Sequence, residues 1–153
     1  MALALGCAAL SLGGCGETPA EAPAEEAGIP GMAITNARLV LPPVAGNPAA
    51  VYFDLDYEGD RNLALNRAEV KGARSATFHD YGEYDMKVQM MDMLPMPIKK
   101  GDKVSFEPGG KHIMVMEPDD TLKPGGTAEV TIIVSGGKSQ TFDAPIKAAG
   151  DER

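Results

Sequence analysis

Both histidines of the chain, His79 and His112, lie in or beside its methionine-rich part, where seven of the nine methionines fall between residues 86 and 116. Ten residues separate His79 from Met90, twenty-one separate Met90 from His112, and one separates His112 from Met114. Imidazole and thioether are borderline or soft ligands, and together they favour monovalent copper over zinc, magnesium or calcium. These four side chains are therefore candidate ligands for Cu(I).

A strand would place His112 and Met114 on one face, because side chains two residues apart point the same way. Met116 would share that face as an auxiliary donor, and Met91 is a second auxiliary candidate beside Met90. The other methionines of this stretch are interpreted as packing residues or exposed neighbours, since Met is a common gap-filler in cores.

His79 and Met90 can share an ion with that pair only if their segments form a hairpin. A turn centred between Tyr84 and Asp85 would put His79 and Met90 opposite each other, about 5 Å apart. Gly82 offers a competing turn, which would pair His79 with Asp85 and move Met90 away. The spacing leaves both turns open.

Composition limits the other possibilities. A chain of 153 residues has room for one domain, and a net charge of −8 argues against nucleic acid as a partner. The only cysteines are Cys7 and Cys15, which excludes a thiolate zinc site, a catalytic cysteine and a blue-copper centre from the folded body. No nucleophile triad or phosphate-binding pattern is present, so we expect a binding or transfer protein rather than an enzyme.

The amino terminus resembles a targeting signal. Residues 1–14 are uncharged and rich in Ala, Leu and Gly, as in a secretory signal. They end in Leu12-Gly13-Gly14-Cys15, which resembles the bacterial lipobox, and Cys7 follows a weaker version of it. We predict a lipoprotein signal peptide over 1–14, an acylated Cys15, and a location in the bacterial periplasm on a lipid anchor. A cleaved signal with an incidental cysteine is the alternative.

The rest of the chain divides into three parts. Residues 15–30 contain Glu, Pro and Ala but no aromatic residue, which predicts a flexible tether. Residues 31–147 show short apolar alternations between Gly/Pro-rich turns, for example over 51–57 and 128–134, and residues 148–153 form a short tail. Seven or eight such strands predict a single all-β domain, an immunoglobulin-like β-sandwich or a small barrel. We expect residues 63–70 to be a loop or a single turn.

The spacing of the four candidate ligands resembles the signature of the periplasmic copper chaperones called PCu(A)C. The stretch Pro108-Gly109-Gly110-Lys111-His112-Ile113-Met114-Val115-Met116 is similar to that family's Pro-Gly-Gly-x-His-Ile-Met-Leu-Met segment, and the likeness covers roughly residues 32–146. The sequence departs from the family where Asp80 follows His79, a position at which Met is common.

The resemblance implies a cupredoxin-like β-domain that binds Cu(I) near its surface through His79, Met90, His112 and Met114. It also implies delivery of copper to the copper A centre of cytochrome c oxidase, with a thioredoxin-like copper chaperone as a further partner. The family's His/Met-rich tail is missing from residues 147–153, so we expect one ion per chain, and we expect a monomer.

Two other functions fit the same residues. A periplasmic copper buffering or resistance protein would share the site but not the acceptor. A metal-free interaction module of the cell envelope would use the methionines as an apolar patch instead.

Overall fold

A computed structural model describes residues 28–151. Its secondary structure consists of ten strands, and residues 28–151 contain no helix. The strands are β1 (Met32–Val40), β2 (Ala49–Tyr57), β3 (Leu63–Val70), β4 (Ala73–Tyr84), β5 (Lys87–Asp92), β6 (Met96–Ile98), β7 (Asp102–Phe106), β8 (His112–Pro118), β9 (Thr127–Val134) and β10 (Ser139–Lys147). The described part of the chain thus offers no apolar helix of membrane-spanning length. The predicted signal peptide, Cys15 and most of the predicted tether lie outside the described residues.

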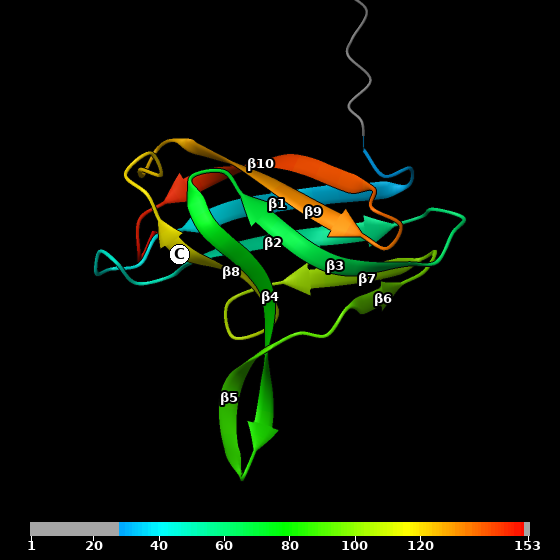
Figure 1. Cartoon of the computed structure of the whole chain (residues 1–153), viewed down its shortest axis with the longest axis horizontal. Helices are drawn as coiled ribbons and strands as arrows, with labels where there is room; N and C mark the ends of the chain where they lie inside the picture. Colours follow the sequence, from blue (N-terminus) through cyan, green and yellow to red (C-terminus); the bar gives the residue numbers. More distant parts are fainter. Residues whose placement is uncertain (1–27, 152–153) are drawn as a thin grey trace, which may run out of the picture.

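Seven of the strands close into a barrel (Figure 1). Their order is β4-β8-β2-β1-β10-β9-β3, and β3 pairs with β4 through Ala68 and Ala76 to complete the circle. The remaining strands extend this barrel: β5 pairs with β4, β6 with β3, and β7 with the second half of β2. The prediction of an all-β domain is confirmed, and of its two forms, a β-sandwich or a small barrel, the structure shows the barrel, with ten strands where seven or eight were expected.

Strict alternation in β2 and β9 builds much of the core. Val51, Phe53, Leu55 and Tyr57 are buried along β2, as the period of two predicts, and every second residue of β9 from Ala128 to Val134 is buried too. The ring of Phe53 stacks on Phe106 of β7 with 4.2 Å between ring centroids.

The prediction of a loop or turn over residues 63–70 is wrong, because this segment is strand β3. Its buried residues are Leu65, Ala68 and Val70, a spacing that no single strand period produces. The ladder with β9 explains it: between Leu65 and Arg67 the chain has one residue more than the facing strand. This β-bulge changes which face is buried, and so it hides the alternation in the sequence.

Ile29, which the prediction assigns to the tether, belongs to the folded domain. Ile29 is 4% exposed within the core, and its backbone N–H donates to Oε1 of Gln140 at 2.8 Å. A composition averaged over residues 15–30 does not reveal one buried apolar side chain at the end of that range.

Gly31 occupies a turn that no other residue fits. Its φ of +80° is in the left-handed region, and an added Cβ would lie 2.6 Å from Cα of Gly59 and 2.8 Å from the carbonyl carbon of Glu58. Gly46 has a similar φ of +88°, but a Cβ there meets nothing within 4 Å. An added side chain would cause backbone strain alone at Gly46, and both backbone strain and a steric clash at Gly31.

We expect Gly46→Ala to lower the free energy of unfolding by about 1–2 kcal/mol, the cost of a left-handed non-glycine residue. Gly31→Ala should lower it by roughly 1–3 kcal/mol more, because the backbone of residues 58–59 must also move. Urea titration of both variants measures the difference. Equal losses would show that the contact with Gly59 relaxes without cost.

Candidate metal centre

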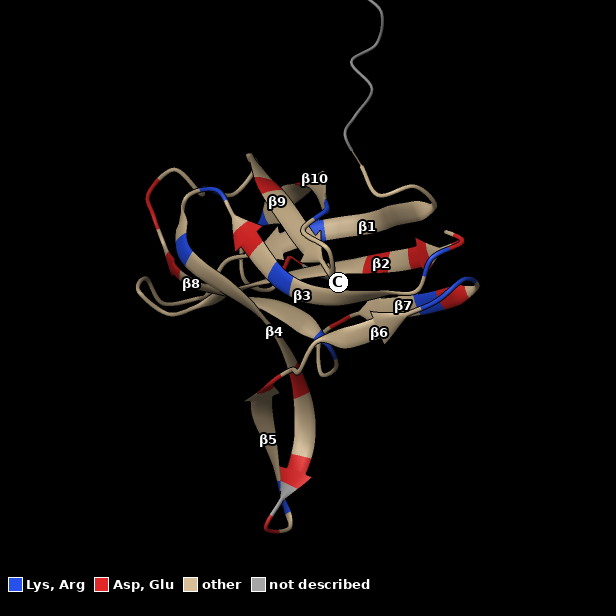
Figure 2. Cartoon of the chain, turned by 45° about the vertical axis from the view of Figure 1, so that its right-hand side comes forward, with Lys and Arg blue, Asp and Glu red and all other residues tan. Residues whose placement is uncertain are grey.

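Strand β4 leaves the barrel at His79. Residues 73–79 of β4 pair with β8, whereas residues 79–84 pair with β5, so that His79 has a partner on each side. Beyond this point β4 and β5 form a two-stranded arm that projects from the barrel (Figure 1). Acidic residues lie at the base of the arm and near its tip (Figure 2).

The arm turns at Asp85 and Met86, which have φ values of 52° and 56°. Tyr84 pairs with Lys87, so this is a two-residue hairpin turn of the type in which both central residues have positive φ. Neither of the turns weighed from the sequence, at Tyr84-Asp85 or at Gly82, is present. Such turns usually carry a glycine, and its absence here made the apex hard to locate.

The shifted turn changes the partner of Met90. His79 faces Asp92, and Met90 faces Tyr81, two residues nearer the tip than the expected pairing. Because the shift is by two residues, Met90 stays on the same face of the arm as His79. The direct pairing of His79 with Met90 that a turn at Tyr84-Asp85 would give is therefore absent, but the two residues remain diagonal neighbours.

The four candidate ligands share one face of the sheet β5-β4-β8. His79 lies directly opposite His112, with 5.8 Å between the ring centroids. Met114 faces Thr77, which lies one step from His79 towards the barrel, whereas Met90 lies one step towards the arm tip. The two methionines thus flank the histidine pair, each displaced along the strands by roughly 7 Å. On the other face, Phe78 and Ile113 belong to the core.

His112 is held firmly. Its side chain is 3% exposed, and Nδ1 is 2.9 Å from the carbonyl oxygen of Gly110. Three rings surround it, those of His79, Tyr81 and Tyr52, with centroids 5.8, 5.9 and 6.3 Å away. The Pro-Gly-Gly turn before β8 supplies the carbonyl that orients the imidazole.

His79 is held through its other ring nitrogen. Nε2 is 2.7 Å from Oδ1 of Asp92 and 2.9 Å from Oγ1 of Thr77. Nδ1 is buried and has no hydrogen-bond partner among residues 28–151. Burial lowers the pKa of His79 below its usual 6.5; Asp92 opposes this shift and His112 adds to it. The neutral ring, which is the form that binds a metal, is therefore favoured in the folded protein.

This shift predicts an acid-dependent loss of stability. Because the pKa of His79 is lower in the folded state, the unfolded chain binds more protons once the pH falls below about 6.5. The contribution of His79 is complete above that pH and is lost as the pH falls through the folded-state pKa. We expect the metal-free protein to lose less unfolding free energy between pH 7.5 and pH 5 when His79 is replaced by Gln. Identical pH profiles for the two proteins would contradict this.

The two auxiliary candidates, Met116 and Met91, lie on opposite faces of the sheet. Met116 faces Ser75 and shares the face of Met114 and His112, with 38% of its surface exposed. Met91 pairs with Asp80 and so points to the opposite face, where its methyl group lies against Gly82. Met91 is thus not placed to assist a site on the first face, since one residue along a strand reverses the side-chain direction. Met93 and Met96 are partly buried against the core, as expected of packing residues.

Asp80 stands at the position where Met is common in the family that the sequence resembles, and here it forms an ion pair. Its Oδ2 is 2.9 Å from Nζ of Lys111, the residue before His112. Burial acts to raise the pKa of Asp80, but the bonds from Lys111 and from the Tyr81 backbone outweigh it, and the pKa is lowered. This ion pair joins the base of the arm to the start of β8 on the side away from the candidate ligands.

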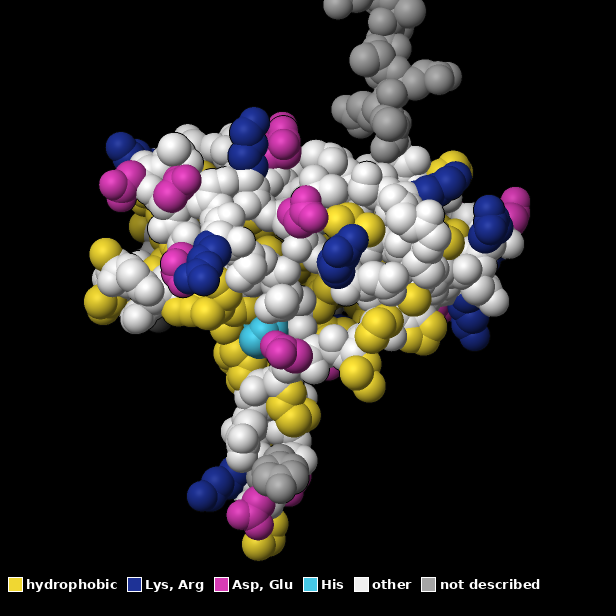
Figure 3. Space-filling model, in the orientation of Figure 1, with side chains coloured by type: hydrophobic (Ala, Val, Ile, Leu, Met, Phe, Trp, Pro, Cys, Tyr) yellow, Lys and Arg dark blue, Asp and Glu magenta, His cyan; other side chains and the backbone are white. Residues whose placement is uncertain are grey.

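The candidate centre is open to solvent at the arm. Histidine surface is visible where the arm joins the barrel, with hydrophobic side chains beside it (Figure 3). Residues 28–151 hold no group of three His, Cys, Asp or Glu placed to bind a metal. The donor set assembled here differs from such groups in that half of it is thioether.

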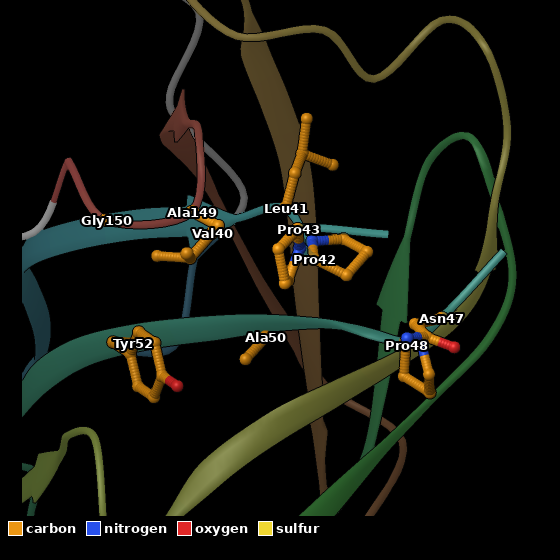
Figure 4. Close-up of a pocket in the computed structure, with 10 residues that line it drawn as sticks. All are labelled: Val40, Leu41, Pro42, Pro43, Asn47, Pro48, Ala50, Tyr52, Ala149 and Gly150. Carbon is orange, nitrogen blue, oxygen red and sulfur yellow. The ribbon is translucent and has the colours of Figure 1, made fainter. Parts of the chain in front are cut away.

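A groove of about 600 Å³ adjoins this face along β2. Pro42, Pro43 and Pro48 line it together with Ala50 and Tyr52 (Figure 4). Ala50 is the cross-strand partner of Met114, so the groove borders the candidate ligands. It contains no histidine or methionine and is separate from the centre itself.

Sequence reasoning missed the residues that orient the ligands. Thr77 and Tyr81 lie two residues on either side of His79 in β4, so the strand period could have found them. Gly110 lies in the Pro-Gly-Gly turn before β8, which the sequence motif contains. Asp92 could not be found in this way, because its place depends on the turn at Asp85 and Met86.

The family model for LpqE-like lipoproteins matches residues 32–146. The chain belongs to the LpqE-like family. No curated protein sequence matches it.

Solved structures resemble this LpqE-like chain throughout the barrel. The copper-bound PCuAC domain from PmoF2 is 21% identical with a TM-score of 0.63, and the match covers 77% of this chain and 93% of that one. The solution structure of CuI-DR1885 from Deinococcus radiodurans is 22% identical with a TM-score of 0.59, covering 82% and 84%. The apo PCuAC domain from PmoF1 is 20% identical with a TM-score of 0.62, covering 77% and 94%. The predicted cupredoxin-like, all-β, single-domain fold is confirmed.

Proposed function

We propose that this LpqE-like protein binds one Cu(I) ion through His79, Met90, His112 and Met114 and carries it to an acceptor, without itself being an enzyme. The observation that carries the proposal is the pairing of His79 with His112 across β4 and β8, with both methionines on the same face. Two of the similar domains are described as copper-bound or Cu(I)-bound, which supports the choice of metal.

The chemistry of this donor set suits a carrier. All four donors are neutral, so the ion keeps its single charge, and thioethers bind Cu(I) without first losing a proton. Met90 is 40% exposed and lies on the projecting arm. A partly exposed sulfur can be replaced by a ligand of an incoming protein, which allows the ion to pass without being released to water.

Competition with a chromogenic Cu(I) chelator tests the proposal. We expect a 1:1 complex of nanomolar or tighter affinity, which corresponds to roughly 12 kcal/mol or more of binding free energy. X-ray absorption of the complex should count both nitrogen and sulfur neighbours. Failure to compete with the chelator would favour the metal-free interaction module.

The acceptor is the finer part of the proposal. We propose the copper A subunit of cytochrome c oxidase, with a thioredoxin-like copper chaperone as a further partner, and the alternative is copper buffering or resistance. Incubating the Cu(I)-loaded protein with the apo copper A domain separates the two. Transfer within the time of the assay supports delivery, whereas retention of the ion supports buffering.

The cellular setting belongs to the same proposal. We propose a monomer anchored in the periplasm through a lipid on Cys15, which would keep a carrier of Cu(I) near membrane-bound acceptors. Membrane fractionation of bacterial cells that make the full chain tests the anchor. Recovery of the whole population in the soluble periplasmic fraction would overturn it.

A further inference from the structure

The two candidate histidines are held through different ring nitrogens. At His112, Nδ1 is 2.9 Å from the carbonyl oxygen of Gly110. A carbonyl can only accept a hydrogen bond, so Nδ1 carries the proton. In a neutral imidazole the remaining nitrogen, Nε2, then has the free lone pair.

At His79 the arrangement is reversed. Nε2 is 2.7 Å from Oδ1 of Asp92, and an ionised carboxylate is also only an acceptor, so Nε2 carries the proton. Oγ1 of Thr77, 2.9 Å from the same nitrogen, lies on that side of the ring too. The lone pair is thus on Nδ1, the buried atom that has no hydrogen-bond partner among the described residues.

We infer that Cu(I) binds to Nδ1 of His79 and to Nε2 of His112, and that Asp92 is the positioning residue that selects Nδ1 at His79. The inference rests on the proposed function, because it assigns the donor atoms of the same site. Carboxylate or carbonyl oxygens that bind the second ring nitrogen commonly fix the tautomer and orientation of a metal-ligating histidine. Here a carboxylate does so for one ring and a backbone carbonyl for the other.

The strand register of the arm explains why Asp92 lies beside His79. The two-residue turn at Asp85 and Met86 puts Asp92, and not Met90, directly opposite His79. The cross-strand position beside His79 is therefore occupied by an oxygen that orients the ring, and the sulfur lies one step further along the arm. The position of this turn thus places the Asp92 carboxylate beside His79 and Met90 beside Tyr81.

Nitrogen NMR of histidine-labelled protein tests the donor atoms, since Cu(I) is diamagnetic. Before copper is added, His79 should show the pattern of a ring protonated on Nε2, and His112 that of a ring protonated on Nδ1. On adding Cu(I), the large nitrogen shifts should fall on Nδ1 of His79 and Nε2 of His112. A shift of Nε2 at His79 would overturn the inference while leaving the proposed function intact. No binding to any histidine, with no competition against the chelator, would instead refute the proposed function.

Variants of Asp92 test its positioning role. Its side chain is 82% exposed, so replacing it should not disturb folding. We expect Asp92→Ala to weaken Cu(I) binding by about 10-fold to 100-fold and to abolish the preference for the Nε2-protonated ring. Asp92→Asn keeps an acceptor oxygen and should restore much of both.

Asp80→Ala is the matched control, because it removes a neighbouring carboxylate that pairs with Lys111 on the other face. It should leave the tautomer of His79 unchanged and weaken Cu(I) binding by less than threefold. Equal effects of the Asp92 and Asp80 substitutions would show that only the local charge matters. Tighter binding by Asp92→Ala would show that the carboxylate competes with the metal, and either result overturns the positioning role.

Discussion

Replacing Met114 by leucine is expected to weaken Cu(I) binding by at least about 100-fold, equivalent to roughly 2.7 kcal/mol. Leucine has nearly the same volume, so the packing of β8 against β4 is kept while one of two proposed sulfur donors is lost. Met114 is only partly exposed and faces Thr77 on the same face as both histidines. The chelator competition described above measures the change directly.

Met96→Leu is the matched control for Met114→Leu. Met96 lies in β6, is partly buried against the core, and faces Leu65 rather than the candidate ligands. We expect its Cu(I) affinity to stay within about twofold of the original protein, about 0.4 kcal/mol. Equal losses in the two variants would show that the ion is not bound on the β5-β4-β8 face.

Phe53→Ala is expected to lower the free energy of unfolding by about 3–5 kcal/mol, the usual cost of removing a buried aromatic ring. Phe53 is 1% exposed, stacks on Phe106 and also contacts Phe142 with 5.3 Å between centroids. Its strand, β2, pairs with β8 in its first half and with β7 in its second half, so the cavity would open where three strands meet.

Chemical denaturation compares this variant with Val88→Ala, which changes a residue that is 74% exposed on the arm. The latter should change the unfolding free energy by less than about 0.5 kcal/mol. If Phe53→Ala cost no more than Val88→Ala, the surrounding rings must collapse into the space and the core would be far more plastic than its packing implies.

The fold was predictable in segments where the alternation of buried and exposed residues runs without interruption. Alternation identified β2 and β9, and Gly136-Gly137 marked the hairpin into β10, because each strand there keeps one face buried along its length. Prediction failed at β3, where the bulge after Leu65 reverses the faces. A bulge is set by the pairing of two distant strands, and a single segment does not encode it.

In the candidate site too, local sequence predicted what lies within one strand and not what depends on the pairing of strands. The placement of His112 and Met114 on one face followed from the strand period alone, and the structure has them there. The relation of His79 to Met90 depended on a turn of two residues without glycine, which local sequence did not locate. The opposition of His79 and His112 was not foreseen at all, since it results from the antiparallel register of β4 and β8, set by the barrel as a whole.

The place of β1 in the barrel has a consequence for how the chain reaches its native state. β1 pairs in parallel with β10, through Leu39 with Ile146 and Val40 with Lys147, so the first strand needs the last one to complete its ladder. A contact of such long sequence separation slows folding, because a large loop must close before any contact energy is gained. Synthesis of nearly the whole domain must therefore precede closure of the ladder between β1 and β10.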